Sequence, residues 1–212
     1  MRVIPLSPSE YGRNLELVAG MHRLRYRVFK ERLDWSVSVV GDMEADAYDS
    51  LGPDYLLVLA DDGEVVGCVR LLPTTGPNML ADTFPVLLDG KPMPRSPGLY
   101  ESSRFCLDTQ QAQDVDDSGL RKATFLLFTA MIEWGIERSP DGIITVTDLR
   151  MERVLRRAGW PLERVGPPVR VGSTVAVAGI VESSRSVLER VVPEWGISGR
   201  VLDAEPGRAK AA

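Results

Sequence analysis

Helical and strand-like segments alternate along the second half of the chain, and this alternation restricts the fold more than any other feature. Residues 120–137 carry apolar side chains every three or four positions, which predicts a long amphipathic helix. The β-branched run at residues 143–147 predicts a strand, and the helix expected after it ends at Gly159. Residues 173–181 and 183–191 predict another strand and a last helix. Strands separated by helices indicate an α/β fold.

The first half of the chain adds a helix and a β-hairpin. Apolar side chains recur at helical spacing through residues 15–33, with Arg25 and Phe29 near the edge of the apolar stripe. Two β-rich runs, residues 55–60 and 64–72, flank an Asp-Asp-Gly sequence that favours a tight turn. The other expected elements are a short helix and a strand, at residues 78–84 and 99–107. We therefore expect an α/β sandwich with a mixed sheet.

The size and composition of the chain indicate one globular unit. Its 212 residues fit a single domain, which we place at residues 1–202. The last ten residues, 203–212, have too little apolar content to pack and are expected to be disordered. No apolar run approaches the roughly 18 residues that cross a bilayer, and the first residues lack the apolar block of a signal peptide. We expect a cytoplasmic protein without a membrane partner, in which Cys68 and Cys106 are reduced, buried thiols.

Charge is distributed unevenly along the sequence. The net charge of -5 argues against general nucleic-acid binding, which needs a basic surface. Between Leu33 and Val69 the chain has nine acidic residues and no lysine or arginine, a composition that suits a cationic ligand. Six arginines between Arg150 and Arg170 suit an acidic partner. The alternative, that both segments are ordinary solvated surfaces, remains open at this point.

A set of charged and aromatic residues follows a fixed order between residues 25 and 160. The members are Arg25, Phe29, Trp35, Asp46, Asp49, Arg70, Phe84, Glu101, Ser103, Arg104 and Phe105. Each short motif alone occurs by chance in many proteins, but the whole set in this order resembles the signature of LuxI-type acyl-homoserine-lactone synthases. The general form of residues 146–160 is part of the same resemblance.

The resemblance implies both a fold and a reaction. The implied fold is a three-layer sandwich like that of GNAT N-acetyltransferases, in which a twisted mixed sheet opens into a V-shaped cleft. The implied activity is autoinducer synthesis for quorum sensing. The amine of S-adenosylmethionine attacks an acyl thioester, carried by acyl carrier protein or coenzyme A, and the methionyl carboxylate then displaces methylthioadenosine to close the lactone. S-adenosylmethionine is a substrate here, and no cofactor is implied.

The resemblance also assigns roles to residues. The S-adenosylmethionine side comprises Arg25, Phe29, Trp35, Asp46, Asp49, Arg70 and Phe84, which offer aromatic faces and carboxylates to a cationic ligand. The catalytic set is Glu101, Ser103 and Arg104, in which Glu101 holds or relays the amine proton. Alternatively, Glu101 only pairs with Arg70 or Arg104, and Phe29 and Trp35 are plain core aromatics. Because strand side chains alternate, Arg104 should point away from Glu101 and Ser103. We therefore expect Arg104 to join Arg25 and Arg70 in a charge network with Asp46 and Asp49.

The acyl chain and its carrier are expected to contact the later elements. The expected acyl-chain pocket consists of Phe105, Leu127, Met131, Thr145, Thr147 and Leu155, although each residue could equally be plain core. In the family, a threonine on this strand is associated with 3-oxo chains. Arg153 and Arg157 lie four residues apart on the expected helix and could meet acyl carrier protein. A further basic residue expected on the later strand is not clearly matched, since Ser-Thr-Val stands at residues 173–175. Acyl carrier protein is the favoured donor, and coenzyme A stays open as the alternative.

Other functions find less support in the sequence. His22 is the only histidine and is expected on a helix surface, no nucleophile elbow occurs, and no cluster has the spacing of metal ligands. A GNAT-type N-acyltransferase should carry a Gly-rich pyrophosphate loop before a helix. The acidic residues 116–117 stand where that loop would be. This N-acyltransferase and a non-catalytic binding protein on the same fold are the alternatives.

Overall fold

A computed structural model describes residues 1–108 and 122–202, so the predicted helix cap near residues 117–118 and the predicted tail lie outside the described part. Contacts divide the chain into two compact units. The first unit comprises the described residues of Met1–Arg70, Arg104–Ala130 and Gly199–Ala212, and the second those of Leu71–Ser103 and Met131–Ser198. We describe each unit by itself. The prediction of a single domain over residues 1–202 stays a prediction.

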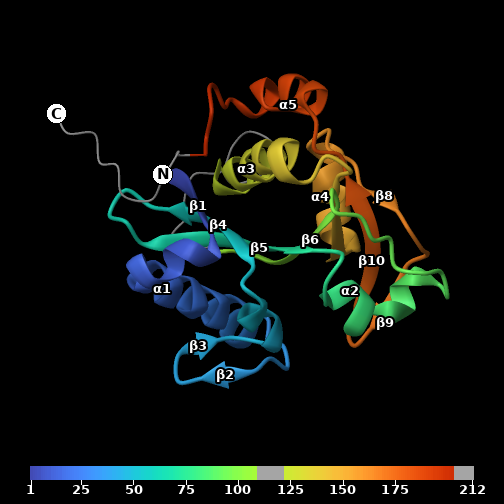
Figure 1. Ribbon diagram of the computed structural model, residues 1–212, viewed down its shortest axis with the longest axis horizontal. Coiled ribbons are helices and arrows are strands. Elements are labelled where there is room, and N and C mark those ends of the chain that lie inside the picture. The colour runs from blue at the N-terminus through green and yellow to red at the C-terminus, as the bar shows by residue number, and fades with distance from the viewer. Residues whose placement is uncertain (109–121, 203–212) are drawn as a thin grey trace. The chain divides into compact units, whose positions relative to one another are not determined.

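In the first unit, strands and a helix enclose an apolar core. Strand β1 (Arg2–Leu6) pairs antiparallel with β4 (Asp54–Leu59), and β4 leads into β5 (Val65–Pro73) through the predicted Asp-Asp-Gly turn (Figure 1). Gly63 in this turn has φ +90°, a conformation that favours glycine. Helix α1 (Leu15–Arg25) buries Met21 and Leu24 in a core with Ile4, Leu57 and Cys68. Arg25 was expected at the edge of the apolar stripe, but its side chain is fully buried.

The first predicted helix changes its geometry halfway. Beyond α1, residues Tyr26–Arg32 form a π-helical segment, η2, which buries Val28 and Phe29. The helix predicted over residues 15–33 is therefore present, but its second half is π-helical rather than α-helical. An α-helix and a π-helix place apolar residues at similar spacings, so periodicity does not separate them.

Short elements that periodicity did not predict connect η2 to β4. They are the ribbon of β2 (Val39–Val40) and β3 (Met43–Glu44), and the 3-10 turn η3 (Ala47–Leu51). Runs of two residues are too short to show an alternating pattern. Of the acids in the segment identified in the sequence, Glu44 lies in β3 and Asp49 in η3.

The second unit is built on two long antiparallel strands. Strand β7 (Ile143–Asp148) pairs with β10 (Thr174–Val181), which also pairs with β8 (Glu163–Arg164) and β9 (Val169–Val171). Helix α4 (Leu149–Arg157) contacts β7 and β10 (Figure 1), and α5 (Arg185–Val191) follows β10. The short helix α2 (Met79–Asp82) and the turn η4 (Pro85–Leu88) pack one face of the strands through Leu80 and Leu87.

Three elements have residues in both units: β5, strand β6 (Tyr100–Leu107) and helix α3 (Lys122–Arg138). Strand β6 runs parallel to β7, with Tyr100 opposite Ile143 and Ser102 opposite Thr145. The strand order of the main sheet is β1-β4-β5-β6-β7-β10-β8, with β9 beside β10. The sheet has parallel and antiparallel pairs, so the predicted mixed α/β fold is confirmed. No helix of the described residues is long and apolar enough to span a membrane.

Candidate functional site

Six charged side chains form a cluster in the first unit. The members are Arg25 at the end of α1, Glu44 in β3, Asp46 and Asp49 at η3, Arg70 in β5 and Arg104 in β6. We refer to this set as the arginine–carboxylate cluster. It contains the five residues predicted to form a charge network, together with Glu44, which was not predicted.

Arg25 is the most deeply buried cation of the cluster. Its Nε donates to Glu44 Oε2 at 2.5 Å, and its two terminal nitrogens donate to the two oxygens of Asp49 at 2.8 and 2.9 Å. The Arg25 and Glu44 side chains are fully buried. Two parallel N–H bonds to one carboxylate fix the guanidinium plane as well as its position.

The other two arginines converge on Asp46. Arg70 Nη1 donates to Asp46 Oδ1 at 2.5 Å and to Asp49 Oδ1 at 2.8 Å. Arg104 Nη2 lies 2.7 Å from Asp46 Oδ2 and donates to Glu44 Oε1 at 3.0 Å. Each carboxylate of the cluster therefore meets two arginines.

Local backbone structure holds the two aspartates in place. Asp46 caps η3 by accepting from the Tyr48 N–H at 2.9 Å, and the Asp46 N–H donates to Asp49 Oδ2 at 2.8 Å. This reciprocal arrangement is a capping box. Tyr55, which was predicted only as a strand residue, donates its hydroxyl hydrogen to Asp49 Oδ1 at 2.6 Å.

The acidic and basic side chains of the cluster are equal in number. Burial alone would raise the pKa of Asp49, but the hydrogen bond and charge of Arg25 and the charge of Arg70 hold it well below its usual range. The same burial, with the Asp49 charge, raises the pKa of Tyr55. Three guanidinium groups face three carboxylates, so the cluster does not provide the surplus negative charge that the sequence suggested for a cationic ligand.

Aromatic side chains lie against the cluster. The rings of Phe29 and Trp35 stack with centroids 5.2 Å apart, and the Arg104 guanidinium lies 5.5 Å from the Phe29 centroid. Phe29 is buried, whereas Trp35 is 46% exposed and leaves one ring face available. Trp35 is therefore not a plain core aromatic.

Arg104 has an unusual backbone for a strand residue. Its φ of +54° is in the left-handed region, which side-chain-bearing residues adopt at a cost of about 1–3 kcal/mol. Strict alternation of side chains, on which we based the direction of Arg104, does not continue through this residue. Strain of this kind concentrates at functional sites.

Glu101 is a residue of β6 in the second unit, and its carboxylate lies at the beginning of α2. Its Oε2 accepts from the Met79 N–H at 2.8 Å and its Oε1 accepts from the Leu80 N–H at 2.6 Å. The side chain is 1% exposed, and the two bonds tie β6 to the first turn of α2. Ser103 is half-buried in the same strand, and Phe84 is half-buried against the core of the second unit.

The predicted acyl-chain residues belong to both units. Phe105 and Leu127 are in the first unit, where Phe105 packs beside Phe128 at 5.5 Å. The second unit holds Met131, Thr145, Thr147 and Leu155. Leu127, Met131 and Leu155 are buried, whereas both threonines are half-buried. The Thr145 hydroxyl donates to Ser102 O at 3.3 Å.

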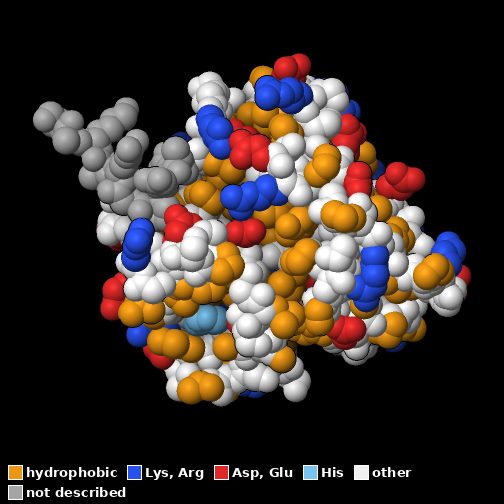
Figure 2. All heavy atoms as spheres, viewed as in Figure 1, with side chains coloured by type: hydrophobic (Ala, Val, Ile, Leu, Met, Phe, Trp, Pro, Cys, Tyr) orange, Lys and Arg blue, Asp and Glu red, His pale blue; other side chains and the backbone are white. Residues whose placement is uncertain are grey.

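Helix α4 presents basic side chains to solvent. Arg153 and Arg157 are exposed as predicted, and the buried Glu152 on this helix pairs with Arg164 at 2.6 Å. That pairing lowers the pKa of Glu152, with the Arg164 hydrogen bond as the main cause. Over the face shown in Figure 2, acidic and basic side chains are interspersed rather than separated.

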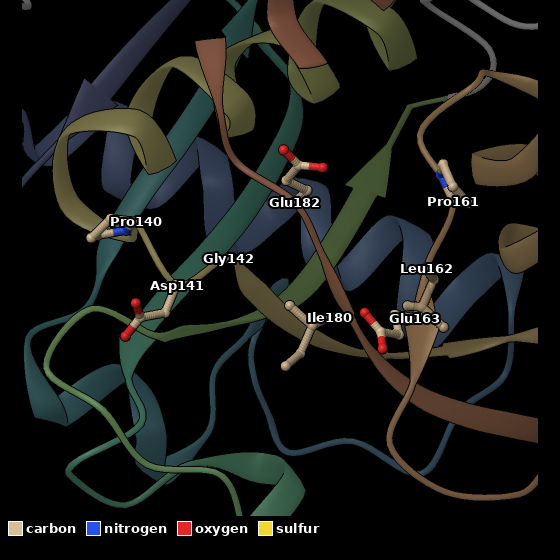
Figure 3. Close-up of a pocket in the computed structure, with 8 residues that line it drawn as sticks. All are labelled: Pro140, Asp141, Gly142, Pro161, Leu162, Glu163, Ile180 and Glu182. Atoms are coloured by element: carbon tan, nitrogen blue, oxygen red, sulfur yellow. The ribbon is translucent and has the colours of Figure 1, made fainter. Parts of the chain in front are cut away.

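The remaining candidates differ in how well they were predicted. Cys68 and Cys106 are free and buried, as expected, with their sulfur atoms 3.5 Å apart. His22, which was expected on a helix surface, is half-buried on α1, with Nδ1 2.7 Å from Glu44 O. A pocket of about 410 Å³ in the second unit lies between Gly142, Leu162 and Ile180 (Figure 3), and no predicted site residue lines it.

Comparison with known proteins shows the family of the chain. The Autoinducer synthase family model matches residues 10–191. An acyl-homoserine-lactone synthase of Agrobacterium fabrum is 46% identical over 211 residues, covering 100% of both chains. The crystal structure of the synthase LasI matches with a TM-score of 0.77 at 38% identity, covering 88% of this chain and 93% of LasI.

More distant structures share the fold. BjaI, a CoA-dependent acyl-homoserine lactone synthase with SAM and isopentyl-CoA, has a TM-score of 0.84 at 22% identity over 97% of this chain and 93% of BjaI. A putative N-acetyltransferase from Lactobacillus plantarum has a TM-score of 0.53 at 16% identity, covering 85% and 99%. The fold is thus GNAT-like. The chain belongs to the autoinducer synthase family of acyl-homoserine-lactone synthases, and it is accordingly a transferase.

Proposed function

We propose that the protein joins an acyl thioester to S-adenosylmethionine, closes the homoserine lactone and releases methylthioadenosine. The observation that carries this proposal is the arginine–carboxylate cluster with its exposed aromatic ring, in a chain of this family. Trp35 offers a ring face to the sulfonium or adenine of the ligand. Because the six charges of the cluster balance, we assign it the positioning of Asp46, Asp49 and Phe29 rather than attraction of a cation.

Glu101 is the proposed acceptor of the amine proton. An α-amine with a pKa of about 7.7–8.0 is already partly neutral at pH 7, so a weak base suffices. The Glu101 oxygens accept from the backbone N–H groups of Met79 and Leu80, which hold the carboxylate in place. A water molecule between the amine and Glu101 completes the proton path. Ser103 and Arg104 follow Glu101 in β6, and we assign them to the same step.

Lactone closure needs no further reactant. One oxygen of the methionyl carboxylate attacks the methionyl side-chain carbon that is bonded to the sulfonium sulfur. The bond between this carbon and the sulfur breaks, and its electron pair leaves with methylthioadenosine. The reaction consumes one S-adenosylmethionine and one thioester per lactone. No cofactor enters this scheme.

The exposed arginines of α4 indicate the acyl donor. We propose acyl carrier protein, because Arg153 and Arg157 are exposed on α4 and carry the charge that an acidic partner needs. BjaI, which shares the fold, is CoA-dependent, so acyl-coenzyme A is the alternative donor.

The test is a reconstituted reaction analysed by mass spectrometry. The purified protein is incubated with S-adenosylmethionine and either acyl carrier protein or coenzyme A loaded with the same acyl chain. We expect acyl-homoserine lactone and methylthioadenosine in equal amounts, with the carrier-bound chain used more efficiently. Acylation of another amine without lactone would indicate a GNAT-type N-acyltransferase. S-adenosylmethionine binding without any product would indicate a binding protein.

A further inference from the structure

One tryptophan of the second unit lacks the hydrogen bond that buried tryptophans usually make. Trp134 in α3 is 3% exposed, and its indole N–H has no hydrogen-bond partner among the described residues. By contrast, Trp160 Nε1 donates to Glu182 O at 2.7 Å and Trp195 Nε1 donates to Ala158 O at 3.0 Å. A buried donor without an acceptor is costly, so it indicates an acceptor that arrives from outside.

Trp134 lies on the same side of β6 and β7 as the predicted acyl-chain threonines. Its ring meets Tyr100 edge to face, with centroids 4.9 Å apart. Tyr100 is opposite Ile143 in the register, and Ser102 is opposite Thr145, so these four residues share one face. The other face, with Ile144, packs against Leu80 and Leu99.

Helix α3 approaches this face close to Trp134. A side chain built at Gly135 would lie 3.4 Å from Ile143 Cδ1. Because α3 connects to β7 through a short loop, the two elements run in opposite directions. The Trp134 ring contacts Tyr100, the register partner of Ile143, and lies 5.7 Å from the Arg138 guanidinium carbon. Thr145 follows Ile143 on the same face, about 7 Å further along β7.

The chemistry of the free donor restricts its acceptor. An indole N–H only donates and carries no charge, so in an apolar interior it suits an uncharged oxygen. Thr145, one of the two threonines that the sequence suggested for this role, already donates its hydroxyl hydrogen to Ser102 O. The Trp134 indole N–H, which has no acceptor among the described residues, is a further donor on this face.

We propose that the Trp134 indole N–H donates to the 3-oxo oxygen of the bound acyl chain, which makes Trp134 a specificity-determining residue. The proposal rests on the proposed function, because it needs an acyl chain on this face of the sheet. Loss of the N–H then leaves the ketone buried without a donor, which lowers the preference for 3-oxo chains.

The test compares two acyl chains of equal length, with and without the 3-oxo group. In Trp134→Phe, the ratio of kcat/KM for the 3-oxo chain to kcat/KM for the plain chain should fall about tenfold, because the N–H donor is lost. The smaller ring affects both chains alike and so cancels in the ratio. Trp160→Phe is the matched control, because it removes an N–H that already has an acceptor, and its ratio should equal that of the wild type. The proposal is overturned if this ratio is unchanged in Trp134→Phe. It is also overturned if the ratio falls in Thr145→Val and not in Trp134→Phe.

A second measurement does not depend on turnover or on the fold of a variant. The 15N–1H resonance of the Trp134 indole is followed in the wild-type protein while ready-made lactones are added. A shift for the 3-oxo lactone that the plain lactone does not produce supports the proposal, and equal shifts, as expected for a bound water, contradict it. Absence of lactone synthesis by the wild type would contradict the proposed function instead, while this resonance would still decide the role of Trp134.

Discussion

Asp49 is the carboxylate on which most of the buried charge depends, because Arg25, Arg70 and Tyr55 all donate to it. Replacing Asp49 with Asn keeps the size of the side chain but leaves the buried Arg25 and Arg70 guanidinium groups with one carboxylate fewer. We expect Asp49→Asn to lower the free energy of unfolding by about 3–5 kcal/mol, measured by urea denaturation at pH 7.

Asp42→Asn is the matched control, because Asp42 forms an exposed ion pair with Arg23 and should contribute at most about 1 kcal/mol. The pH dependence adds a check. The folded-state pKa of Asp49 is lowered, so its contribution is fully present above the unfolded value near 4 and is lost only as pH falls below it. A stability gap between wild type and Asp49→Asn that already narrows between pH 7 and pH 5 would contradict this account.

The sequence predicted part of the cluster at the level of single residues. The pairing of Arg25, Arg70 and Arg104 with Asp46 and Asp49 follows from charge and motif order, since buried arginines need carboxylate partners. Glu44 was present as one of nine acids in the same segment, but nothing in its spacing distinguished it. The positive φ of Arg104 has no sequence signal, because arginine gives no indication of a left-handed backbone.

Helix α4 carries the two exposed arginines at which we expect acyl carrier protein to bind. Reversing both Arg153 and Arg157 to Glu should raise the apparent KM for acyl carrier protein at least about tenfold, because two attractive charges become repulsive. Turnover at saturating carrier should change less. Steady-state kinetics with purified carrier protein measure both quantities.

The matched control reverses Arg185 and Arg190, two exposed arginines of α5, which changes the net charge by the same amount. Its KM for the carrier should stay close to that of the wild type. Added salt should raise the wild-type KM, because it screens exposed charges. Equal effects of the two double variants would mean that overall charge matters rather than α4.

Elements with strong periodicity were predicted well, and short ones were not. Helices α3 and α4 and strands β7 and β10 were expected within about two residues of their bounds, because each repeats its pattern several times. The short strands β2, β3, β8 and β9 depend on pairing partners that a local pattern does not reveal. The first turn of α2 donates to Glu101, which lies 21 residues beyond Leu80.

For the whole molecule, the fold and family agree with what the motif order suggested. The mixed sheet follows from the alternation of strands and helices, and the family model covers residues 10–191. Sequence periodicity did not show that β5, β6 and α3 contribute to both compact units, because such sharing depends on long-range contacts. The two units hold different predicted site residues: the arginine–carboxylate cluster in one, and Glu101, Thr145 and Thr147 in the other.

The central claim is that one protein both acylates S-adenosylmethionine and closes the lactone by direct displacement. The most direct measurement is the mass of the lactone made from S-adenosylmethionine carrying 18O in both carboxylate oxygens. Direct attack by the carboxylate retains both labels in the lactone, one in the ring and one in the carbonyl, and this is the predicted result. Loss of one label would mean that water first displaces methylthioadenosine and that the resulting hydroxyl closes the ring, which would contradict the account.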